Sequence, residues 1–421
     1  MTTDADVARV LIHTGKGGVG KTTAAAATAV RLARDGHRTL VMSTDVAHSL
    51  GDVLDHPLGD QPTPVMPGLD AEQLQTQQRL RSGWQEIGDY LQALLAWGGA
   101  DALEAAELAV LPGLDELFAL LDLDAHARSR RYDVIVVDCA PTAETLRLLS
   151  LPEVLGWYIE RLLPVQRHVA RALRPTVGRV TSMPLPHDGV FRAVGTLYDR
   201  LQAVRGLLLD PAHTSVRLVV TPDRVVLAEA RRMLTSLGLF GHPVDAVLVN
   251  RVVPADVTDP FLVGWRARQQ RVAAELVATV GDVPQLRIGL AAHEPVGVTG
   301  LADLADELYS TVDPATVLYA GPRPEVVDTG DGHALRLPLP DSVADDVDLL
   351  QRADELYVSV GGYTRNVVLP AALRSCQVTS ATVTDGWLSI GFDPPSRVPA
   401  PGAQPAPDVG RPTAPRRPRL H

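Results

Sequence analysis

A glycine-rich loop near the N-terminus, GKGGVGKTT at residues 15–23, constrains the fold of this chain more than any other feature. The apolar run VLIHT precedes the loop, and an alanine-rich stretch of helical character follows it. In such a strand–loop–helix unit, backbone N–H groups and the N-terminus of the helix surround a phosphate group. The sequence therefore predicts a phosphate-binding loop that begins an α/β domain.

The chain has only two lysines, Lys16 and Lys21, and both lie in this loop. A lysine ammonium is compact and fits inside a tight ring of N–H groups, whereas the planar guanidinium of arginine needs more room. We predict that Lys21 binds the β- and γ-phosphates of a nucleotide and that the Thr22 hydroxyl binds Mg²⁺. The other members of the predicted nucleotide site in this loop are Gly15, Lys16, Gly17, Gly18, Val19, Gly20 and Thr23.

Further apolar runs alternate with helical patterns along residues 1–318. RTLVMSTD, YDVIVVDCA, SVRLVVTP and VDAVLVNRVV are rich in valine, isoleucine and leucine. Continuous apolar strands separated by helices predict a mostly parallel, doubly wound sheet covered on both faces. Two longer helical stretches, at about residues 71–130 and 152–209, predict a helical subdomain inserted into this α/β domain.

The pattern changes in residues 323–393, where short alternating runs are separated by Gly-Gly and Asp-Gly pairs. This pattern is typical of a small all-β domain. Residues 394–421 are rich in proline and arginine with few large apolar side chains, so we expect a disordered tail.

Composition excludes several classes of protein. The only cysteines, Cys139 and Cys376, are too few for a disulfide framework or a four-thiolate zinc site. The net charge of -11 argues against nucleic-acid binding. No apolar run is long enough to span a bilayer, and no secretory signal is recognisable, so we expect a cytoplasmic protein.

The pattern K-G-G-V-G-K-T resembles the deviant Walker A motif of the family that includes ParA, MinD, the nitrogenase iron protein and the ArsA ATPases. In that family the first lysine reaches across a dimer interface to the nucleotide of the partner. The resemblance implies an ATP-dependent homodimer in which Lys16 acts in trans.

Two later segments resemble the switch regions of the ArsA group, which includes the targeting factor for tail-anchored membrane proteins. STDVAHSL resembles switch I, and the resemblance implies that Asp45 positions the attacking water, although Val46 replaces the proline of the family. VVDCAPTAETLRLL resembles switch II and implies that Asp138 holds Mg²⁺ through water. Ala143 and Glu144 replace the Gly-His pair of that motif.

VLVNRVV is similar to the strand of this group whose asparagine contacts adenine, which implies that role for Asn250. LAAHEPVG resembles the loop that closes over the base, with Ala292 in place of a proline. The resemblance covers about residues 9–309. In the β segment, YVSVGGYTRNVVLPAAL and ATVTDGWLSIGF resemble the small heat-shock (α-crystallin-like) domain of some bacterial ArsA-like ATPases, and an unrelated β-sandwich is the alternative.

Together these features predict a dimeric, Mg²⁺-dependent ATPase switch of the ArsA type that handles or targets a hydrophobic client or a membrane partner. The first alternative is the catalytic subunit of an arsenite- or anion-transporting ATPase, although two cysteines cannot form a three-thiolate arsenite site. The others are a positioning ATPase of the ParA or MinD type and a nucleotide-gated interaction module with negligible turnover. A positioning ATPase would need a basic DNA-binding face or a C-terminal amphipathic helix, and the proline-rich tail cannot form such a helix.

Overall fold

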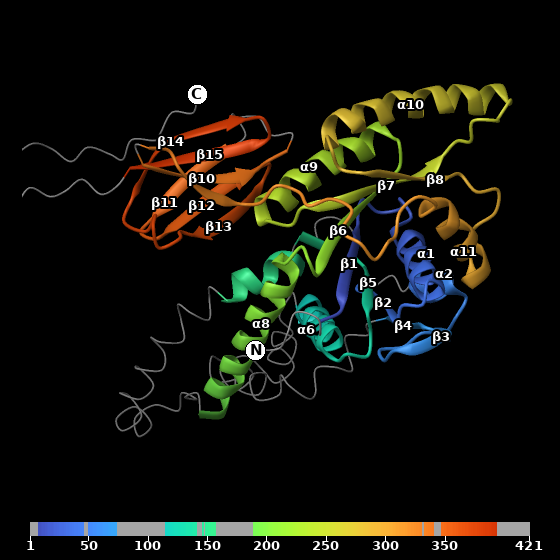
Figure 1. The fold of residues 1–421 in the computed structure, drawn as a ribbon, viewed down its shortest axis with the longest axis horizontal. Helices are drawn as coiled ribbons and strands as arrows, with labels where there is room; N and C mark the ends of the chain where they lie inside the picture. Colours follow the sequence, from blue (N-terminus) through green and yellow to red (C-terminus); the bar gives the residue numbers. More distant parts are fainter. Residues whose placement is uncertain are drawn as a thin grey trace, which may run out of the picture. The chain divides into compact units, whose positions relative to one another are not determined.

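The computed structural model describes residues 7–45, 49–73, 114–140, 145–146, 148–156, 188–330, 332–340 and 347–393. The chain divides into two compact units. The first comprises Met1–Leu227, Val244–Ala273 and Asp282–Ala320, and the second comprises Ala228–Pro243, Ala274–Gly281 and Gly321–His421. Each unit contains β-sheet of its own (Figure 1).

An eight-stranded sheet forms the centre of the first unit, with the strand order β3-β4-β2-β5-β1-β6-β7-β8. Its strands are β1 (Arg9–Thr14), β2 (Thr39–Ser43), β3 (Thr63–Met66), β4 (Leu69–Gln73), β5 (Val134–Asp138), β6 (Thr214–Val220), β7 (Val244–Val252) and β8 (Gln285–Gly289). Neighbouring strands are parallel, except that β3 is antiparallel to β4. Every residue of β2, β5 and β6 is buried, as expected for strands between two helical layers. The predicted α/β fold with a mostly parallel sheet is confirmed.

Helices flank this sheet. They are α1 (Lys21–Arg34), α2 (Ser49–Leu54), α6 (Leu114–Arg128), α8 (Asp188–Leu209) and α11 (Gly297–Leu308), while α9 (Arg224–Phe240) and α10 (Pro260–Val280) contribute residues to both units. A run of buried alanines on α1 combines high helix propensity with side chains small enough for close packing. As a result α1 packs closely against α11, and the two lie side by side in Figure 1.

The sequence patterns miss β3, β4 and β8. The apolar periodicity predicts a helix from about residue 71, but residues 71–73 belong to β4 and pair with β2, so that boundary is wrong. The sequences of these strands, TPVM, LDAEQ and QLRIG, contain no continuous apolar run of the kind that identifies β2 and β5. Gly68, at φ 83°, lies in the turn between β3 and β4. Of the two predicted helical stretches the structure describes α6, helical residues 148–156 and α8, while residues 74–113 and 157–187 lie outside the described residues.

The second unit has antiparallel sheets with the strand orders β14-β15-β10-β9 and β11-β12-β13. The strands are β9 (Glu325–Asp328), β10 (His333–Pro338), β11 (Val347–Arg352), β12 (Glu355–Val360), β13 (Tyr363–Val368), β14 (Gln377–Thr384) and β15 (Trp387–Asp393). Alternate residues of both sheets, among them Leu337, Leu356 and Ile390, share one core that also contains Leu239 of α9. The predicted small all-β sandwich is confirmed, while the predicted disordered tail lies outside the described residues. None of the described helices is sufficiently long and apolar to span a bilayer.

Candidate active site

The predicted phosphate loop connects the end of β1 to the start of α1. Gly15 and Gly20 have φ values of 151° and 90°. A side chain at Gly15 would overlap a carbonyl oxygen of β6, and one at Gly20 would overlap the amide of Asn250, so both positions require glycine. Gly17 and Gly18 are exposed, and a Cβ added at either would meet nothing within 4 Å. The outer side of the loop therefore has room for a ligand against its backbone N–H groups.

Lys21 is the first residue of α1, and its side chain is nearly buried. Its Nζ atom donates a hydrogen bond to the backbone oxygen of Lys16 at 3.4 Å, which holds the ammonium group inside the loop. The N-cap residue of α1 is Gly20, which has no side chain to bond the first N–H groups of the helix. These N–H groups and the positive end of the helix dipole are therefore directed at the loop. Lys16 is half-buried on the loop, and its role in a second subunit stays a prediction.

Asp138 ends β5, and its carboxylate is fully buried. Oδ2 accepts a hydrogen bond from the Ser43 hydroxyl at 3.2 Å, whereas Oδ1 has no hydrogen-bond partner among the described residues. Burial raises the pKa of Asp138 to about 6. The hydroxyls of Thr22 and Ser43 and the positive charge of Lys21 lower this pKa, and the negative charge of Asp45 raises it. The unpaired oxygen is a hard donor atom suited to a divalent cation or to a water molecule in its shell.

The predicted switch I aspartate lies next to this carboxylate. Asp45 directly follows β2, and its backbone N–H donates to Ser43 Oγ at 3.3 Å. Ser43 pairs with Asp138 in the β2–β5 ladder and so fixes the distance between the two strand ends. The Thr22 hydroxyl lies 3.1 Å from Ser49 Oγ at the start of α2. Residues 46–48 and 141–144, which belong to the predicted switches, lie outside the described residues.

The sequence patterns do not indicate Ser43 and Ser49, the two serines that hydrogen-bond to Asp138 and Thr22. Their only signal is a hydroxyl residue at each end of the segment STDVAHS. The structure thus brings Lys21, Thr22 and Asp138 together at one edge of the sheet, with Asp45 close enough to affect the same carboxylate. Cys139, the next residue, is buried, and burial raises the pKa of its thiol to about 12, so it behaves as a protonated core residue.

Asn250 holds the phosphate loop from the end of β7. Its Nδ2 donates to the backbone oxygen of Val19 at 2.8 Å, and its Oδ1 accepts from the N–H of Arg251 at 2.8 Å. This supporting role is not apparent from the sequence, because Val19 and Asn250 lie 231 positions apart. One N–H hydrogen of the amide and one lone pair of its oxygen remain, so the adenine contact stays a prediction.

Two side chains of α10 fix the turn that follows Asn250. Gln269 donates from Nε2 to the backbone oxygen of Arg251 at 2.9 Å and accepts at Oε1 from the N–H of Val253 at 2.8 Å. Arg266 donates to two backbone carbonyls further along the turn. No sequence motif indicates either residue, although both are polar and lie three positions apart on the same helix.

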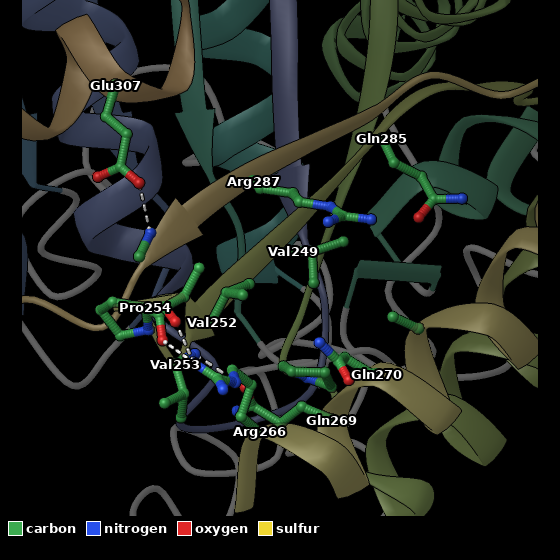
Figure 2. Close-up of a pocket in the computed structure, with 14 residues that line it drawn as sticks. Val249, Val252, Val253, Pro254, Arg266, Gln269, Gln270, Gln285, Arg287 and Glu307 are labelled. Carbon is green, nitrogen blue, oxygen red and sulfur yellow. Dashed lines mark hydrogen bonds between the residues drawn. The ribbon is translucent and has the colours of Figure 1, made fainter. Parts of the chain in front are cut away.

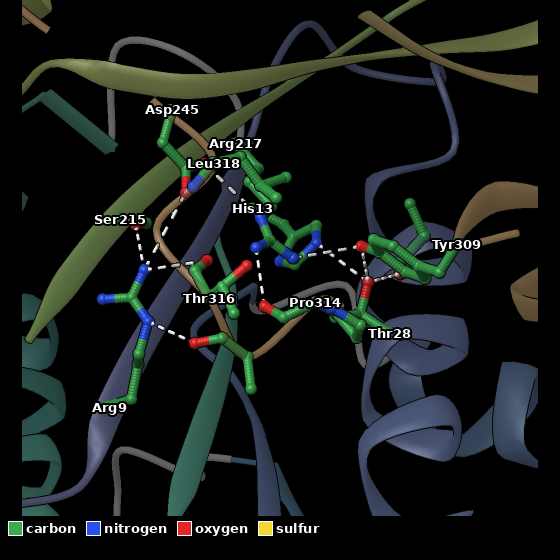
Figure 3. A network of polar contacts seen from close by, with 12 residues as sticks. Arg9, His13, Thr28, Ser215, Arg217, Asp245, Tyr309, Pro314, Thr316 and Leu318 are labelled. Carbon is green, nitrogen blue, oxygen red and sulfur yellow. Dashed lines mark hydrogen bonds and ion pairs between the residues drawn. The ribbon is translucent and has the colours of Figure 1, made fainter. Parts of the chain in front are cut away.

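A buried polar network supports the strands behind the loop (Figure 3). The fully buried guanidinium of Arg217 donates to the Tyr309 hydroxyl at 3.2 Å, to the Pro314 carbonyl at 2.7 Å and to Asp245 Oδ1 at 3.4 Å. The Tyr309 hydroxyl is also 2.6 Å from Thr28 Oγ1 on α1. The network therefore joins β6, β7, α1 and the segment that follows α11.

His13 of β1 extends the same network. Its Nε2 atom lies 3.1 Å from Thr28 Oγ1, and its side chain is completely buried. Burial, with a smaller contribution from the charge of Arg217, lowers the pKa of His13 to about 3. His13 is therefore neutral at physiological pH and serves as a hydrogen-bonding core residue near the end of β1, two positions before Gly15 of the phosphate loop.

Comparisons with known proteins identify relatives that also contain the α/β and the all-β regions of this chain. Residues 8–310 match the family model described as an anion-transporting ATPase, and residues 330–392 match that of the HSP20-like domain found in ArsA. A Chlorobaculum tepidum protein named "Putative arsenical pump-driving ATPase" is 35% identical over 388 residues, which is 91% of this chain and 96% of the relative. An Aquifex aeolicus protein of the same name, numbered 1, is 34% identical over 393 residues, covering 91% of this chain and 99% of the relative.

A Mycobacterium tuberculosis relative, protein Rv2184c, is 37% identical over 420 residues and covers 92% of this chain and 96% of its own length. Similarity to each of these relatives thus extends through both the nucleotide-loop region and the β segment. The chain therefore belongs to the ArsA family of ATPases and contains the HSP20-like domain found in that family.

Proposed function

We propose that this ArsA-family ATPase hydrolyses ATP with Mg²⁺ at the loop of residues 15–23 and acts as a homodimeric switch. The observation that carries the proposal is the unpaired Oδ1 atom of the buried Asp138, close to Thr22 and Lys21. Thr22 would bind the ion directly, and Asp138 would hold it through water. When bound, Mg²⁺ offsets the negative charge of the phosphate oxygens.

The remaining groups have separate roles in this proposal. Lys21 and the N–H groups of the loop bind the β- and γ-phosphates and stabilise the charge that develops on them. Asp45 orients the attacking water, because it follows the end of β2 close enough to Asp138 for its charge to affect that carboxylate. Asn250 keeps the loop in shape through Val19 and contacts the base with its remaining amide hydrogen.

Lys16 would act on the nucleotide of the partner subunit. Mixing Lys16→Arg and Asp45→Asn chains tests this role directly. If Lys16 acts in trans, a mixed dimer has one site with a native Asp45 and a native incoming lysine, so ATPase activity returns on mixing. If Lys16 acts within its own subunit, both sites remain defective and no activity returns. A return of activity together with a dimer in ATP supports the proposal, and a monomer in ATP contradicts it.

We further propose that the switch handles a hydrophobic client. Support comes from the HSP20-like domain on the same chain. Two apolar segments of the predicted helical subdomain, YLQALLAWGG and LPEVLGWYIERLLPV, are suited either to burial in the subdomain core or to lining a client groove, and both lie largely outside the described residues. The test is whether the Asp45→Asn chain keeps a peptide with one transmembrane segment in solution in ATP. A peptide that stays in solution no better with the chain and ATP than without the chain would contradict the proposal.

The names of the relatives favour a second candidate, an ATPase that drives an arsenical pump. Its chemistry needs soft thiolate ligands. Both cysteines of this chain are buried, Cys139 in the first unit and Cys376 in the second. Two such thiols cannot supply a three-thiolate site within one chain, so we rank this candidate second.

A further inference from the structure

A cavity of about 300 Å³ lies between α10 and the face of the sheet formed by β7 and β8 (Figure 2). Its apolar wall includes Val249, Val252 and Ala273, and its polar lining includes Arg287 and Gln285. A cavity of this volume accommodates a small organic molecule and is lined in the way that such sites usually are, by apolar surface with a few polar groups.

The cavity is on the opposite face of the sheet from the contact that holds the phosphate loop. Successive residues of a strand point to opposite faces. Val249 lines the cavity, whereas the next residue, Asn250, bonds to the phosphate loop. Arg287 lies beside Val249 in the parallel β7–β8 pair and, like Gln285 two positions earlier, lines the cavity.

Two polar groups of this lining lack partners within the described part of the chain. The Oε1 atom of Gln285 is buried and accepts no hydrogen bond there, and the side chain of the exposed Arg287 makes no hydrogen bond or ion pair with any described residue. The other charged groups are already engaged, because Arg266 binds backbone carbonyls and Glu307 Oε1 accepts the N–H of Gly289 at 2.7 Å. Figure 2 shows Glu307 at the other end of the cavity from Gln285.

We propose that this cavity binds a small aromatic carboxylate that also carries an N–H or O–H donor. Arg287 pairs with the carboxylate, for which the planar guanidinium offers two parallel donors. The Oε1 atom of Gln285 accepts the donor hydrogen of the ligand. The aromatic body packs on Val249, Val252 and Ala273. This site is separate from the ATP site and does not depend on the proposed mechanism of hydrolysis.

Isothermal titration calorimetry of the full chain with indole-3-acetate tests the proposal, since this probe has a carboxylate, an N–H donor and an apolar body. We expect saturable binding with one site per chain. Indole-3-acetamide, which has the same shape without the charge, should bind about tenfold more weakly. Saturating Mg²⁺–ADP should leave the affinity for indole-3-acetate unchanged.

Variants separate the site from unspecific binding. Arg287→Met should weaken indole-3-acetate about tenfold and remove the preference over the amide, whereas Arg268→Met, on an exposed residue of α10 outside the lining, should change neither. Ala273→Leu should reduce binding of both probes by filling the cavity. Absence of saturable binding, equal binding by Arg287→Met and the parent chain, or displacement of the probe by ADP would each overturn the proposal.

Discussion

Two buried charged groups of the first unit, Arg217 and Asp138, are satisfied to very different degrees. Both side chains have zero exposed surface. Arg217 donates to a carboxylate, a hydroxyl and a backbone carbonyl, whereas Asp138 keeps one oxygen without a partner among the described residues. Burial of a charge is thus not a sign of function by itself. The unsatisfied group, next to the phosphate loop, is the one that can bind a ligand.

The pKa values show the same difference. Burial alone would lower the pKa of Arg217, but the opposite effect of Tyr309 and Asp245 is larger, so the pKa is raised overall. The guanidinium therefore stays charged and paired. For Asp138 burial outweighs the opposing neighbours, and the pKa is about 6. We infer that the Arg217 network stabilises the fold and that Asp138 is held at the expense of stability for catalysis.

The largest expected effect concerns the carboxylate beside Asp138. Asp45→Asn should reduce ATP turnover by at least about 100-fold, because the amide cannot orient and deprotonate water as a carboxylate does. ATP binding and thermal stability should stay near the values of the parent chain. Steady-state ATPase assays and equilibrium titration with a fluorescent ATP analogue measure the two quantities. Turnover at the parental rate would remove Asp45 from the proposed mechanism.

The next effect concerns the buried hydrogen-bond network around Arg217. Arg217→Met should lower the free energy of unfolding by about 3–5 kcal/mol, because it leaves Asp245 buried without its main cation. The double variant Arg217→Met/Asp245→Asn should recover part of this loss. Chemical denaturation followed by circular dichroism provides the measurement. A stability change of Arg217→Met below about 1 kcal/mol would mean that the network does not stabilise the fold as we infer.

A smaller effect is the pH dependence of Mg²⁺ binding. Since the folded pKa of Asp138 is about 6, the carboxylate takes up a proton as the pH falls below that value, and Mg²⁺ must then displace it. The concentration of Mg²⁺ for half-maximal ATPase activity should rise toward about tenfold per pH unit below 6 and stay constant between 7 and 8. ATP binding without Mg²⁺ serves as the control. A flat Mg²⁺ requirement from pH 5 to 7 would contradict the assignment.

The smallest expected effect is that of arsenite, which should leave the ATPase rate unchanged. The reason is that the two buried cysteines cannot form a thiolate site within one chain. The measurement compares ATPase rates with and without arsenite in reducing buffer. A saturable, several-fold activation would favour the arsenical-pump function over the client-handling function.

The sequence contained enough information for the central strands, the loop and the positions of the predicted site residues, because continuous apolar runs and a motif of fixed spacing depend on local chain only. It did not predict the β3–β4 hairpin or β8, because TPVM, LDAEQ and QLRIG contain no continuous apolar run, unlike β2 and β5 of similar length. An arginine within the apolar run SVRLVVTP indicates a buried charge. Its partners Tyr309 and Pro314, however, lie 92 and 97 positions away, where no local pattern reveals them.

The same limit applies to the candidate site. The resemblance of residues 136–149 to switch II predicts a role for Asp138. That its Oδ1 atom has no partner among the described residues, however, depends on how β2, β5 and α1 pack around it. Likewise, the bond from Asn250 to Val19 depends on the approach of β7 to the loop. Tertiary packing therefore decides which buried polar atoms stay available.

The central claim is that Asp138 is kept unsatisfied for ligand binding, and Asp138→Asn tests it most directly. Because the folded pKa is raised, ionisation of Asp138 opposes folding, and its contribution to stability falls as the pH rises from about 4 to about 6. At pH 8 without nucleotide, Asp138→Asn should therefore leave the free energy of unfolding unchanged or raise it by about 1–3 kcal/mol. Mg²⁺-dependent ATPase activity should fall by at least about 100-fold. A loss of stability as large as that of Arg217→Met, or retained ATPase activity, would contradict the account.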